Sequence, residues 1–190
     1  MTRVEIVYLL LFVSVTVIRK YFTAKFKPEK EQLKQSSSAD RLFLGLMGIT
    51  MLLPVLKIWI DLFPWANYPS NAGLQWLGNL VFLLGIYMLY RSHGDLGRNW
   101  NPEVAINAEQ NLIQSGVYKR IRHPMYSAHI LWAIANTFVF ANWIVAPAML
   151  FILILFLPQR INREEAILKD RFGQQYLDYI KTTNSLIPKF

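Results

Sequence analysis

Long apolar runs, separated by short polar segments, constrain the fold of this chain more than any other feature of its sequence. A helix needs about 20 apolar residues to cross a bilayer, and these runs approach that length. They do not alternate between apolar and polar residues, which excludes a transmembrane β-barrel. In chain order the runs are Val4–Ile18, Leu42–Ile60, Gly73–Tyr90, a run that begins at Pro124 and is interrupted at Ala141–Asn142, and its continuation to Leu157.

The composition supports a membrane protein, since 54% of the 190 residues are hydrophobic and the mean hydropathy is +0.26. We therefore predict an all-α integral membrane protein with about five transmembrane helices and a C-terminal amphipathic helix, in a single polytopic domain over residues 1–190. Arg3 precedes the first run, but no small-residue cleavage site follows it, so we interpret this run as an anchor and not as a signal peptide.

Lysine and arginine residues gather in every second segment between the runs. The first connecting segment carries seven of them, whereas the second carries none and has Asp61 as its charge. Short basic loops stay in the cytoplasm, so the alternation predicts an external N-terminus and a cytoplasmic C-terminus in the cell (inner) membrane. Lys57 is expected to pair with Asp61, one helical turn later. Residues 92–122 and 158–190 then face the same compartment, and we predict the catalytic core over residues 92–190.

Several classes of site are excluded. The chain has no cysteine, which rules out disulfides, cysteine-based zinc sites, c-type haem and prenylation of the chain itself. Nucleotide-binding glycine motifs, H-E-x-x-H and G-x-S-x-G are all missing. Three scattered histidines predict no metal site. The net charge of +8 is explained by membrane orientation, and we predict no nucleic-acid partner.

The sequence "RHP" stands where the fourth run begins. Proline is favoured at the first position of a helix, which places His123 at the cap, with its ring beside the free N–H groups. A helix N-terminus attracts anions, and Arg122 adds a two-pronged donor for a carboxylate or phosphate. An anion site and a simple interfacial anchor both stay open. His129, inside the run, is expected to bond a neighbouring helix. The segment "HGDLGRNW", residues 93–100, is expected to be a loop.

The sequence "RINREE" follows the fifth run. Arg160 and Glu164 are neighbours on one helix face, and Glu165 is placed to pair with Lys169. Charges at membrane level are costly, about 2.5–3.5 kcal/mol each, and so indicate a functional site. A solvated charged face is the alternative.

Two blocks of this sequence resemble the isoprenylcysteine carboxyl methyltransferase family. "LIQSGVYKRIRHPMY" is similar to the family core H-x-L-V-x-x-G-x-Y-x-x-x-R-H-P-x-Y, and "RINREEAILKDRFGQQYLDY" is similar to its R-x-x-x-E-E block with the F-G-x-x-Y-x-x-Y that follows. "DLGRNW" also matches the preceding loop. The resemblance runs from about Ser92 to the C-terminus. A related R-H-P core occurs in phospholipid methyltransferases and, more loosely, in relatives of sterol reductases.

The resemblance implies a membrane methyltransferase that uses S-adenosyl-L-methionine and methylates the carboxylate of a prenylcysteine-like or other lipophilic acceptor entering from the bilayer. It assigns the acceptor carboxylate to Arg160, with Arg122 and Glu165 in the same substrate-binding set. One position departs from the pattern, because the family's histidine is Gln110 here, and an amide cannot become cationic. The resemblance assigns the cofactor to Gln110, Asn111, Leu112, Ile113, Tyr118, His123, Pro124, Met125, Tyr126 and Glu164.

The chemistry suits a pocket that excludes water. A carboxylate that attacks a sulfonium methyl group destroys two charges in the transition state, and no strong base is needed because the carboxylate is already ionised. Three alternatives stay open at this point: a lipid N-methyltransferase, in which Glu164 and Glu165 attract an amine; an NADPH-dependent reductase of related fold; and a non-catalytic membrane lipid-binding protein.

Overall fold

The computed structural model describes residues 1–26, 33–34, 38–99, 105–106 and 111–189, and most of them are helical. The predicted all-helical membrane architecture is confirmed. Two residues each form the strands β1 and β2, which pair in antiparallel fashion. The elements are α1 (Arg3–Lys25), β1 (Leu33–Lys34), α2 (Ser38–Ile60), η1 (Pro64–Ala66), α3 (Ala72–Leu96), η2 (Gly97–Asn99), β2 (Ala105–Ile106), η3 (Gly116–Lys119), α4 (Pro124–Val139), α5 (Val145–Phe172) and α6 (Gln174–Thr182).

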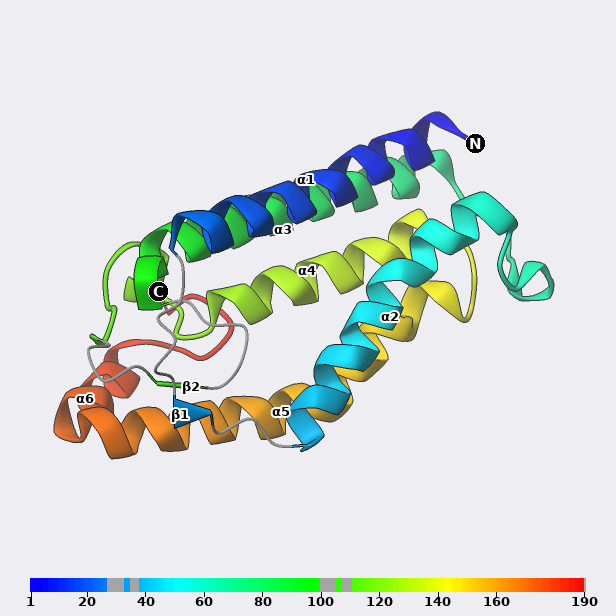
Figure 1. The fold of residues 1–190 in the computed structure, drawn as a ribbon. Coiled ribbons are helices and arrows are strands. Elements are labelled where there is room, and N and C mark those ends of the chain that lie inside the picture. Colours follow the sequence, from blue (N-terminus) through cyan, green and yellow to red (C-terminus); the bar gives the residue numbers. More distant parts are fainter. Residues whose placement is uncertain (27–32, 35–37, 100–104, 107–110, 190) are drawn as a thin grey trace.

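The long helices form two pairs with α4 between them. Figure 1 shows α1 along α3 on one side and α2 along α5 on the other. Helix α4 contacts both α3 and α5, and its residues Trp132, Ala133 and Ala135 belong to the apolar core. The core therefore runs through the middle of the bundle, and the outer faces of the paired helices carry the exposed apolar side chains.

Four helices in the described part of the chain are long and apolar enough to cross a membrane: α1, α2, α3 with its η2 extension, and α5. Helix α4 has 16 residues, which span about 24 Å at 1.5 Å per residue. That is shorter than a hydrocarbon core of about 30 Å. The fourth predicted run is thus a short central helix, while the other four runs form full-length helices.

Glycines on α3 allow α4 to approach closely. A Cβ atom built on Gly78 would lie 2.7 Å from Val139 Cγ2, and one on Gly85 would lie 3.1 Å from the carbonyl oxygen of Ala128. Small residues at such contacts let two helix backbones pack tightly within a membrane. This contact fixes α4, and with it the start of the helix at His123, relative to α3.

A buried polar chain joins α1 to α4 inside the apolar core. The Tyr8 hydroxyl donates to Asn136 Oδ1 at 2.8 Å and accepts from the indole N–H of Trp132 at 3.0 Å. Both Tyr8 and Asn136 are fully buried. Because lipid offers no hydrogen-bond partners, such side chains stabilise the bundle when they satisfy one another.

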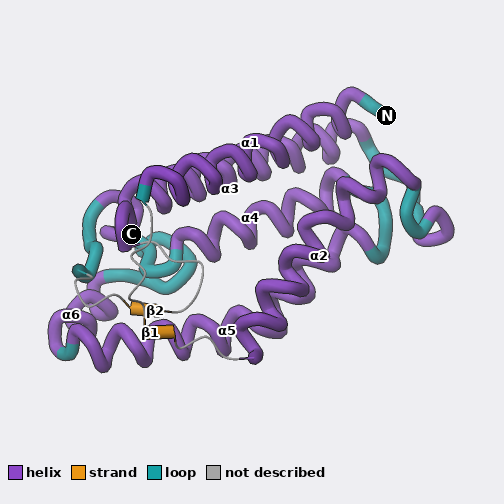
Figure 2. The backbone as a smooth tube through the Cα atoms, viewed as in Figure 1, coloured by secondary structure: helices purple, strands orange, loops and turns teal. Residues whose placement is uncertain are grey.

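The two nearly uncharged loops, residues 61–71 and 140–144, meet at one end of the bundle, which we call the Asn142 end (Figure 2). The Asn142 side-chain amide donates to Asn67 Oδ1 and to the carbonyl oxygen of Phe63, each at 2.8 Å. Trp143 N–H donates to the Ala66 carbonyl oxygen at 3.0 Å. The expected pair between Lys57 and Asp61 forms here as well. The opposite end, which we call the Arg122 end, holds η3, the start of α4, α6 and the C-terminal residues.

Two expectations about helix ends were wrong. The fifth run was expected to end at Leu157, but α5 continues through Pro158 to Phe172 as one helix of 28 residues. Packed membrane helices tolerate an internal proline because neighbouring groups compensate the lost hydrogen bond. The chain turns instead at Gly173, which has a φ of +50°. The predicted C-terminal amphipathic segment is therefore divided between the end of α5 and α6, in which Tyr176 and Tyr179 are buried.

The second error concerns "HGDLGRNW", which was expected to be a loop from His93, whereas α3 continues to Leu96. Side chains hold this last turn in place. Ser92 Oγ donates to the carbonyl oxygen of Met88 at 2.6 Å, and the carboxylate of Asp95 accepts from the Val117 N–H at 2.8 Å. The final turns of α3 therefore support η3, which leads to the start of α4.

Candidate active site

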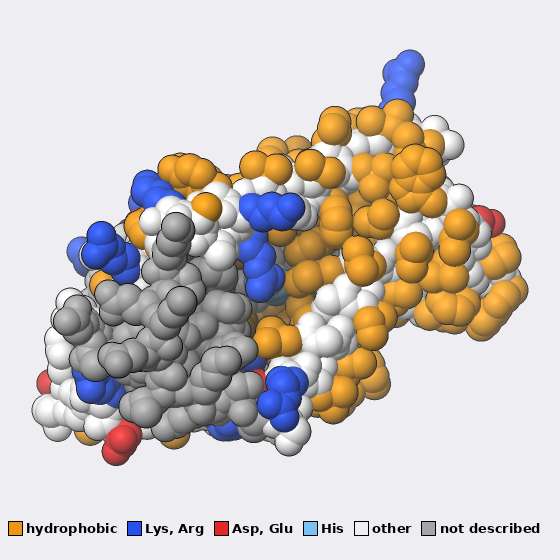
Figure 3. Space-filling view, in the orientation of Figure 1, with side chains coloured by type: hydrophobic (Ala, Val, Ile, Leu, Met, Phe, Trp, Pro, Cys, Tyr) orange, Lys and Arg blue, Asp and Glu red, His pale blue; other side chains and the backbone are white. Residues whose placement is uncertain are grey.

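A large cavity opens between the two helix pairs at the Arg122 end. Its volume is about 860 Å³, at the upper part of the range for small-molecule sites. Figure 3 shows this hollow, with apolar side chains along one part and lysine and arginine side chains beside it. The apolar part is lined from α1 and α2, by Phe12, Val15, Leu44, Met47 and Met51 among others. The polar part is lined mainly from η3, α4 and α5.

The start of α4 forms one wall of the polar part. His123 is the N-cap residue and Pro124 the first helical residue, as predicted, but the ring of His123 makes no capping bond. The C-terminal residues fix this turn from outside. His123 N–H donates to the Ser185 carbonyl oxygen at 2.9 Å, and Ser127 Oγ donates to the Leu186 carbonyl oxygen at 2.6 Å. The position of His123 thus depends on contacts with a segment about 60 residues later in the sequence.

The ring of His123 lies between two carboxylates of α5. Its Nε2 is 3.2 Å from Glu165 Oε1, and its Nδ1 is 3.5 Å from Glu164 Oε2. Burial lowers the pKa of His123, but the two carboxylates outweigh burial and raise it above its ordinary value. The ring also stacks on Tyr126 at 5.6 Å between centroids. His123 therefore links α4 to α5 through these two carboxylates.

This pairing predicts a dependence of stability on pH. A histidine whose pKa is higher in the folded protein stabilises the fold fully below its unfolded pKa of about 6.5, and that stabilisation is lost as the pH rises through the folded value. We expect the melting temperature of the purified protein to fall over this interval, and to fall less in His123→Gln. Differential scanning fluorimetry between pH 6 and pH 9 measures the melting temperature of both proteins. Equal slopes for the parent and the variant would contradict the pairing.

Arg122 and Glu165 bind each other. Arg122 Nε donates to Glu165 Oε1 at 2.9 Å, and its Nη1 donates to the carbonyl oxygen of Thr183. The expected pair of Glu165 with Lys169 was wrong, because the fold brings Arg122 and His123 against this carboxylate. Arg122 lines the cavity, whereas Glu165 lies behind His123 and is not part of the lining. These two residues support the wall of the cavity through their mutual contact.

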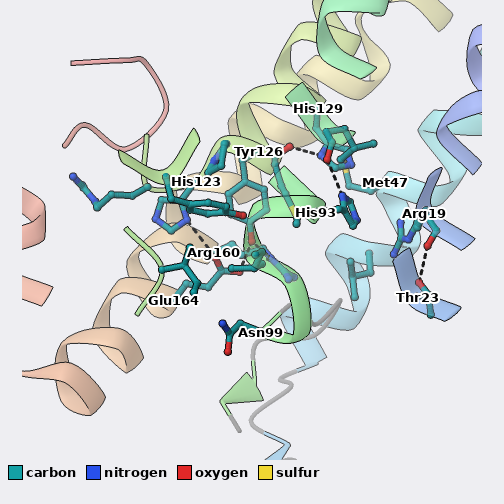
Figure 4. A pocket seen from close by; sticks show the side chains of 18 of the residues that line it. Arg19, Thr23, Met47, His93, Asn99, His123, Tyr126, His129, Arg160 and Glu164 are labelled. Carbon is teal, nitrogen blue, oxygen red and sulfur yellow. Dashed lines mark hydrogen bonds and ion pairs between the residues drawn. The ribbon is translucent and has the colours of Figure 1, made fainter. Parts of the chain in front are cut away.

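Arg160 and Glu164 form the second polar wall, together with Tyr126. Arg160 Nε lies 3.2 Å from Glu164 Oε1, as the i,i+4 spacing predicts, and donates to the Tyr126 hydroxyl at 2.5 Å. That hydroxyl in turn donates to Glu164. The guanidinium of Arg160 also lies over the ring of Phe43 at 5.3 Å. Figure 4 shows Arg160, Glu164, Tyr126 and His123 close together on one side of the cavity.

Asp40 was missed by the sequence analysis. It lies in the first turn of α2, is 4% exposed, and accepts from Arg163 Nη1 at 2.8 Å. Its other oxygen lies 3.8 Å from Arg160 Nη1. The signal was present, since Asp40 is a carboxylate directly before the second apolar run, and charges at this level indicate a site. Asp40 thus fixes Arg160 from behind and connects α2 to α5.

The residues assigned to the cofactor mostly line one cavity. Tyr118 is buried, and its hydroxyl donates to the carbonyl oxygen of Ser92 at 3.4 Å. Gln110 lies outside the described residues, so its role stays a prediction. The cavity lining includes Asn111, Leu112, Ile113, Tyr118, His123, Pro124, Met125, Tyr126 and Glu164. Their binding roles stay predictions.

His129 differs from its expected role between helices. Its Nδ1 lies 2.6 Å from the carbonyl oxygen of Met125 in the same helix, and its ring stacks on Trp132. The side chain lines the cavity close to Met47 and His93 (Figure 4). His93 was also not assigned a role, and it too lines the cavity from α3.

Comparison with known proteins identifies relatives of this chain. Residues 76–170 match the isoprenylcysteine carboxyl methyltransferase (ICMT) family. The chain is 30% identical over 180 residues to protein-S-isoprenylcysteine O-methyltransferase of Saccharomyces cerevisiae. This alignment covers 88% of this chain and 72% of the yeast protein. The chain is also 27% identical over 143 residues to protein-S-isoprenylcysteine O-methyltransferase A of Arabidopsis thaliana. That alignment covers 74% of this chain and 73% of the plant protein.

A solved structure shares the fold. It is the eukaryotic intramembrane Ras methyltransferase ICMT, which superposes with a TM-score of 0.58 at 23% sequence identity and covers 94% of this chain but 66% of its own. The family match includes most of α3, all of α4 and most of α5, and it contains His123, Tyr126, Arg160 and Glu164. The chain is a multi-pass membrane protein that belongs to the isoprenylcysteine carboxyl methyltransferase family.

Proposed function

We propose that this chain is a carboxyl methyltransferase that moves a methyl group from S-adenosyl-L-methionine to the carboxylate of a prenylcysteine-like or other lipophilic acceptor. The observation that carries the proposal is the form of the cavity. An apolar part between α1 and α2 adjoins a polar part in which Arg160, Glu164 and Tyr126 meet. An acceptor with an apolar tail and an anionic head fits such a cavity.

The polar residues suit a cationic methyl donor. Among the described residues that line the cavity, Glu164 is the one carboxylate, and the aromatic rings of Tyr118 and Tyr126 lie near it. Carboxylates bind ammonium groups, and aromatic faces attract cations such as sulfonium. When bound, S-adenosyl-L-methionine supplies an electrophilic methyl group. Asn111, Tyr118, His123, Tyr126 and Glu164 are the described polar residues that would hold it.

In this proposal Arg160 orients the acceptor. Asp40, Tyr126 and Glu164 fix the guanidinium in place, so it binds a carboxylate without first being ordered. Such positioning of two reactants can supply as much as about 7–11 kcal/mol. The surrounding apolar side chains exclude water, which favours a reaction in which an anion and a cation neutralise each other.

A transfer assay tests the proposal and separates it from lipid N-methylation. Detergent-purified protein is incubated with methyl-labelled S-adenosyl-L-methionine and a panel of N-acetyl prenylcysteines and total membrane lipids. We expect alkali-labile label, because methyl esters release methanol in base whereas N-methyl amines do not. Label that is incorporated but stable to base would replace this function with lipid N-methylation.

Binding can be measured separately. A ligand at 100 times its dissociation constant stabilises the folded protein by about 2.7 kcal/mol, so S-adenosyl-L-methionine and S-adenosylhomocysteine are expected to raise the melting temperature. NADPH serves as the comparison compound. Stabilisation by NADPH, with no effect of either sulfur compound, would contradict the methyltransferase proposal and favour a reductase.

The proposed membrane orientation has the Asn142 end outside the cell and the Arg122 end in the cytoplasm. It is supported by the alternation of charge along the chain. We expect a reporter fused after Phe190 to read as cytoplasmic and a reporter inserted at Asn67–Tyr68 to read as external. Alkaline phosphatase and green fluorescent protein fusions distinguish the two sides. A cytoplasmic signal from the second site would contradict the orientation.

A further inference from the structure

A second cationic wall faces the cavity opposite the Arg160 site. It is formed by the cytoplasm-proximal end of α1 and the adjoining end of α3, and we call it the Arg19 wall. Figure 4 shows Arg19 and Thr23 on the far side of the cavity from Arg160 and Glu164, with His93 and Met47 between. The Arg19 wall consists of the cavity-lining residues Arg19, Lys20, Thr23, His93 and Asn99.

The two walls differ in how their charges are paired. At the Arg160 site, each arginine has a carboxylate: Arg160 has Glu164 and Asp40, and Arg163 has Asp40. In the part of the chain that the structure describes, no carboxylate lies within ion-pair distance of Arg19 or Lys20. The positive charge that faces the cavity without a described counter-charge is therefore concentrated on the Arg19 wall.

The neighbours of Arg19 do not use its side-chain donors. The Thr23 hydroxyl donates to the backbone carbonyl oxygen of Arg19 at 2.8 Å, which leaves the guanidinium out of that contact. His93 bonds the carbonyl oxygen of Leu89 through Nδ1 and stacks on Phe22. A guanidinium and an ammonium group on adjacent residues, beside histidine and asparagine, offer donors suited to carboxylate or phosphate oxygens.

We propose that the Arg19 wall is a second anion-binding subsite, which holds a carboxylate or phosphate that the acceptor carries in addition to its methylated carboxylate. This inference rests on the proposed function, in which Arg160 binds the carboxylate that is methylated. The acceptor class is thus an amphiphile with an apolar tail and two separated anionic groups. Its tail occupies the apolar part of the cavity, and each anionic group meets its own cationic wall.

Matched probes test this subsite by binding as well as by turnover. N-acetyl-S-farnesylcysteine carries one carboxylate, and N-succinyl-S-farnesylcysteine adds a second on a short arm. Isothermal titration and transfer assays are run on the full chain in nanodiscs of phosphatidylcholine. We expect the parent protein to bind the diacid at least about tenfold more tightly, the ratio that one charge-assisted hydrogen bond provides. Arg19→Gln and Lys20→Gln are expected to reduce this ratio toward one.

Lys25→Gln is the matched control. Lys25 lies on the same helix and also carries a positive charge, but it contacts the rings of Tyr21 and Phe26 and is not part of the cavity lining. It is expected to keep the parent ratio. A lower ratio in Lys25→Gln equal to that in Arg19→Gln would show a general charge effect and overturn the subsite. A parent protein that binds both probes equally would also overturn it.

The remaining outcomes separate the sources of the anion and the two proposals. If phosphatidylglycerol in the nanodiscs abolishes the preference of the parent for the diacid, the wall binds a lipid headgroup, and the assignment to the acceptor is wrong. If the diacid binds more tightly through Arg19 but neither probe is methylated, the subsite stands and the proposed function fails. If both probes are methylated with equal KM values, the function stands and the subsite is overturned.

Discussion

Replacing Arg160 with alanine is expected to lower methyl transfer to carboxylate acceptors by at least about 100-fold. Arg160 is 7% exposed and is fixed by Tyr126, Glu164 and Asp40, so its loss removes a charged hydrogen bond in a site shielded from water. Losses of that kind commonly cost about 3 kcal/mol or more, and each 1.4 kcal/mol is a factor of ten. The transfer assay measures the rate, and isothermal titration is expected to show little change in cofactor affinity.

Two further variants distinguish the role of Arg160 from a general effect of charge. Arg163→Ala removes a guanidinium one turn away that also pairs with Asp40 but does not line the cavity. It is expected to keep most of the activity. Arg160→Lys is expected to recover part of the activity, because an ammonium group lacks the planar two-pronged geometry. Activity of Arg160→Ala within threefold of the parent would show that this residue has no part in the reaction.

The second large effect is expected for Glu164→Gln, which should weaken binding of S-adenosyl-L-methionine by about tenfold or more. Glu164 is the one carboxylate among the described cavity-lining residues, and a neutral amide of the same shape loses the charge that attracts a cation. Isothermal titration of the purified variant measures the affinity. KM for the acceptor is expected to change less than cofactor affinity does.

Asp170→Asn is the control for Glu164→Gln. Asp170 lies on the same helix, is exposed, and is not part of the cavity lining. Each of the two substitutions replaces one carboxylate of α5 with a neutral amide. If Glu164→Gln and Asp170→Asn bind the cofactor equally well, Glu164 serves only to pair with Arg160, Tyr126 and His123.

The fold could be predicted where local physics decides the outcome. The apolar runs and the "RHP" start of α4 at Pro124 follow from burial in lipid and from the missing N–H of proline. The Arg160–Glu164 pair follows from helical spacing. The end of α5 could not be predicted in this way, because Pro158 normally indicates a boundary and only packing against neighbouring elements keeps the helix continuous.

The candidate site could be predicted in its residues but not in its pairing. Glu165 was placed with Lys169 by local spacing, whereas the fold gives it Arg122 and His123, more than 40 residues away. Asp40 is 120 residues from Arg160, and Ser185 contacts His123 through the backbone. Contacts of this kind depend on how helices come together in space, and a single sequence carries no direct signal for them.

The contacts that hold the bundle together at the Asn142 end determine where a ligand can lie between the two helix pairs. Figure 1 shows the pair α1 and α3 and the pair α2 and α5 converging toward this end and separating toward the other. Hydrogen bonds from Asn142 to Asn67 and Phe63 tie the convergent end together. Because these hydrogen bonds join the loops that close one end, the space between the two pairs lies at the other end, where Arg19 of α1 and Phe43 of α2 line the cavity. A ligand can therefore occupy the open end without disturbing the contacts of Asn142.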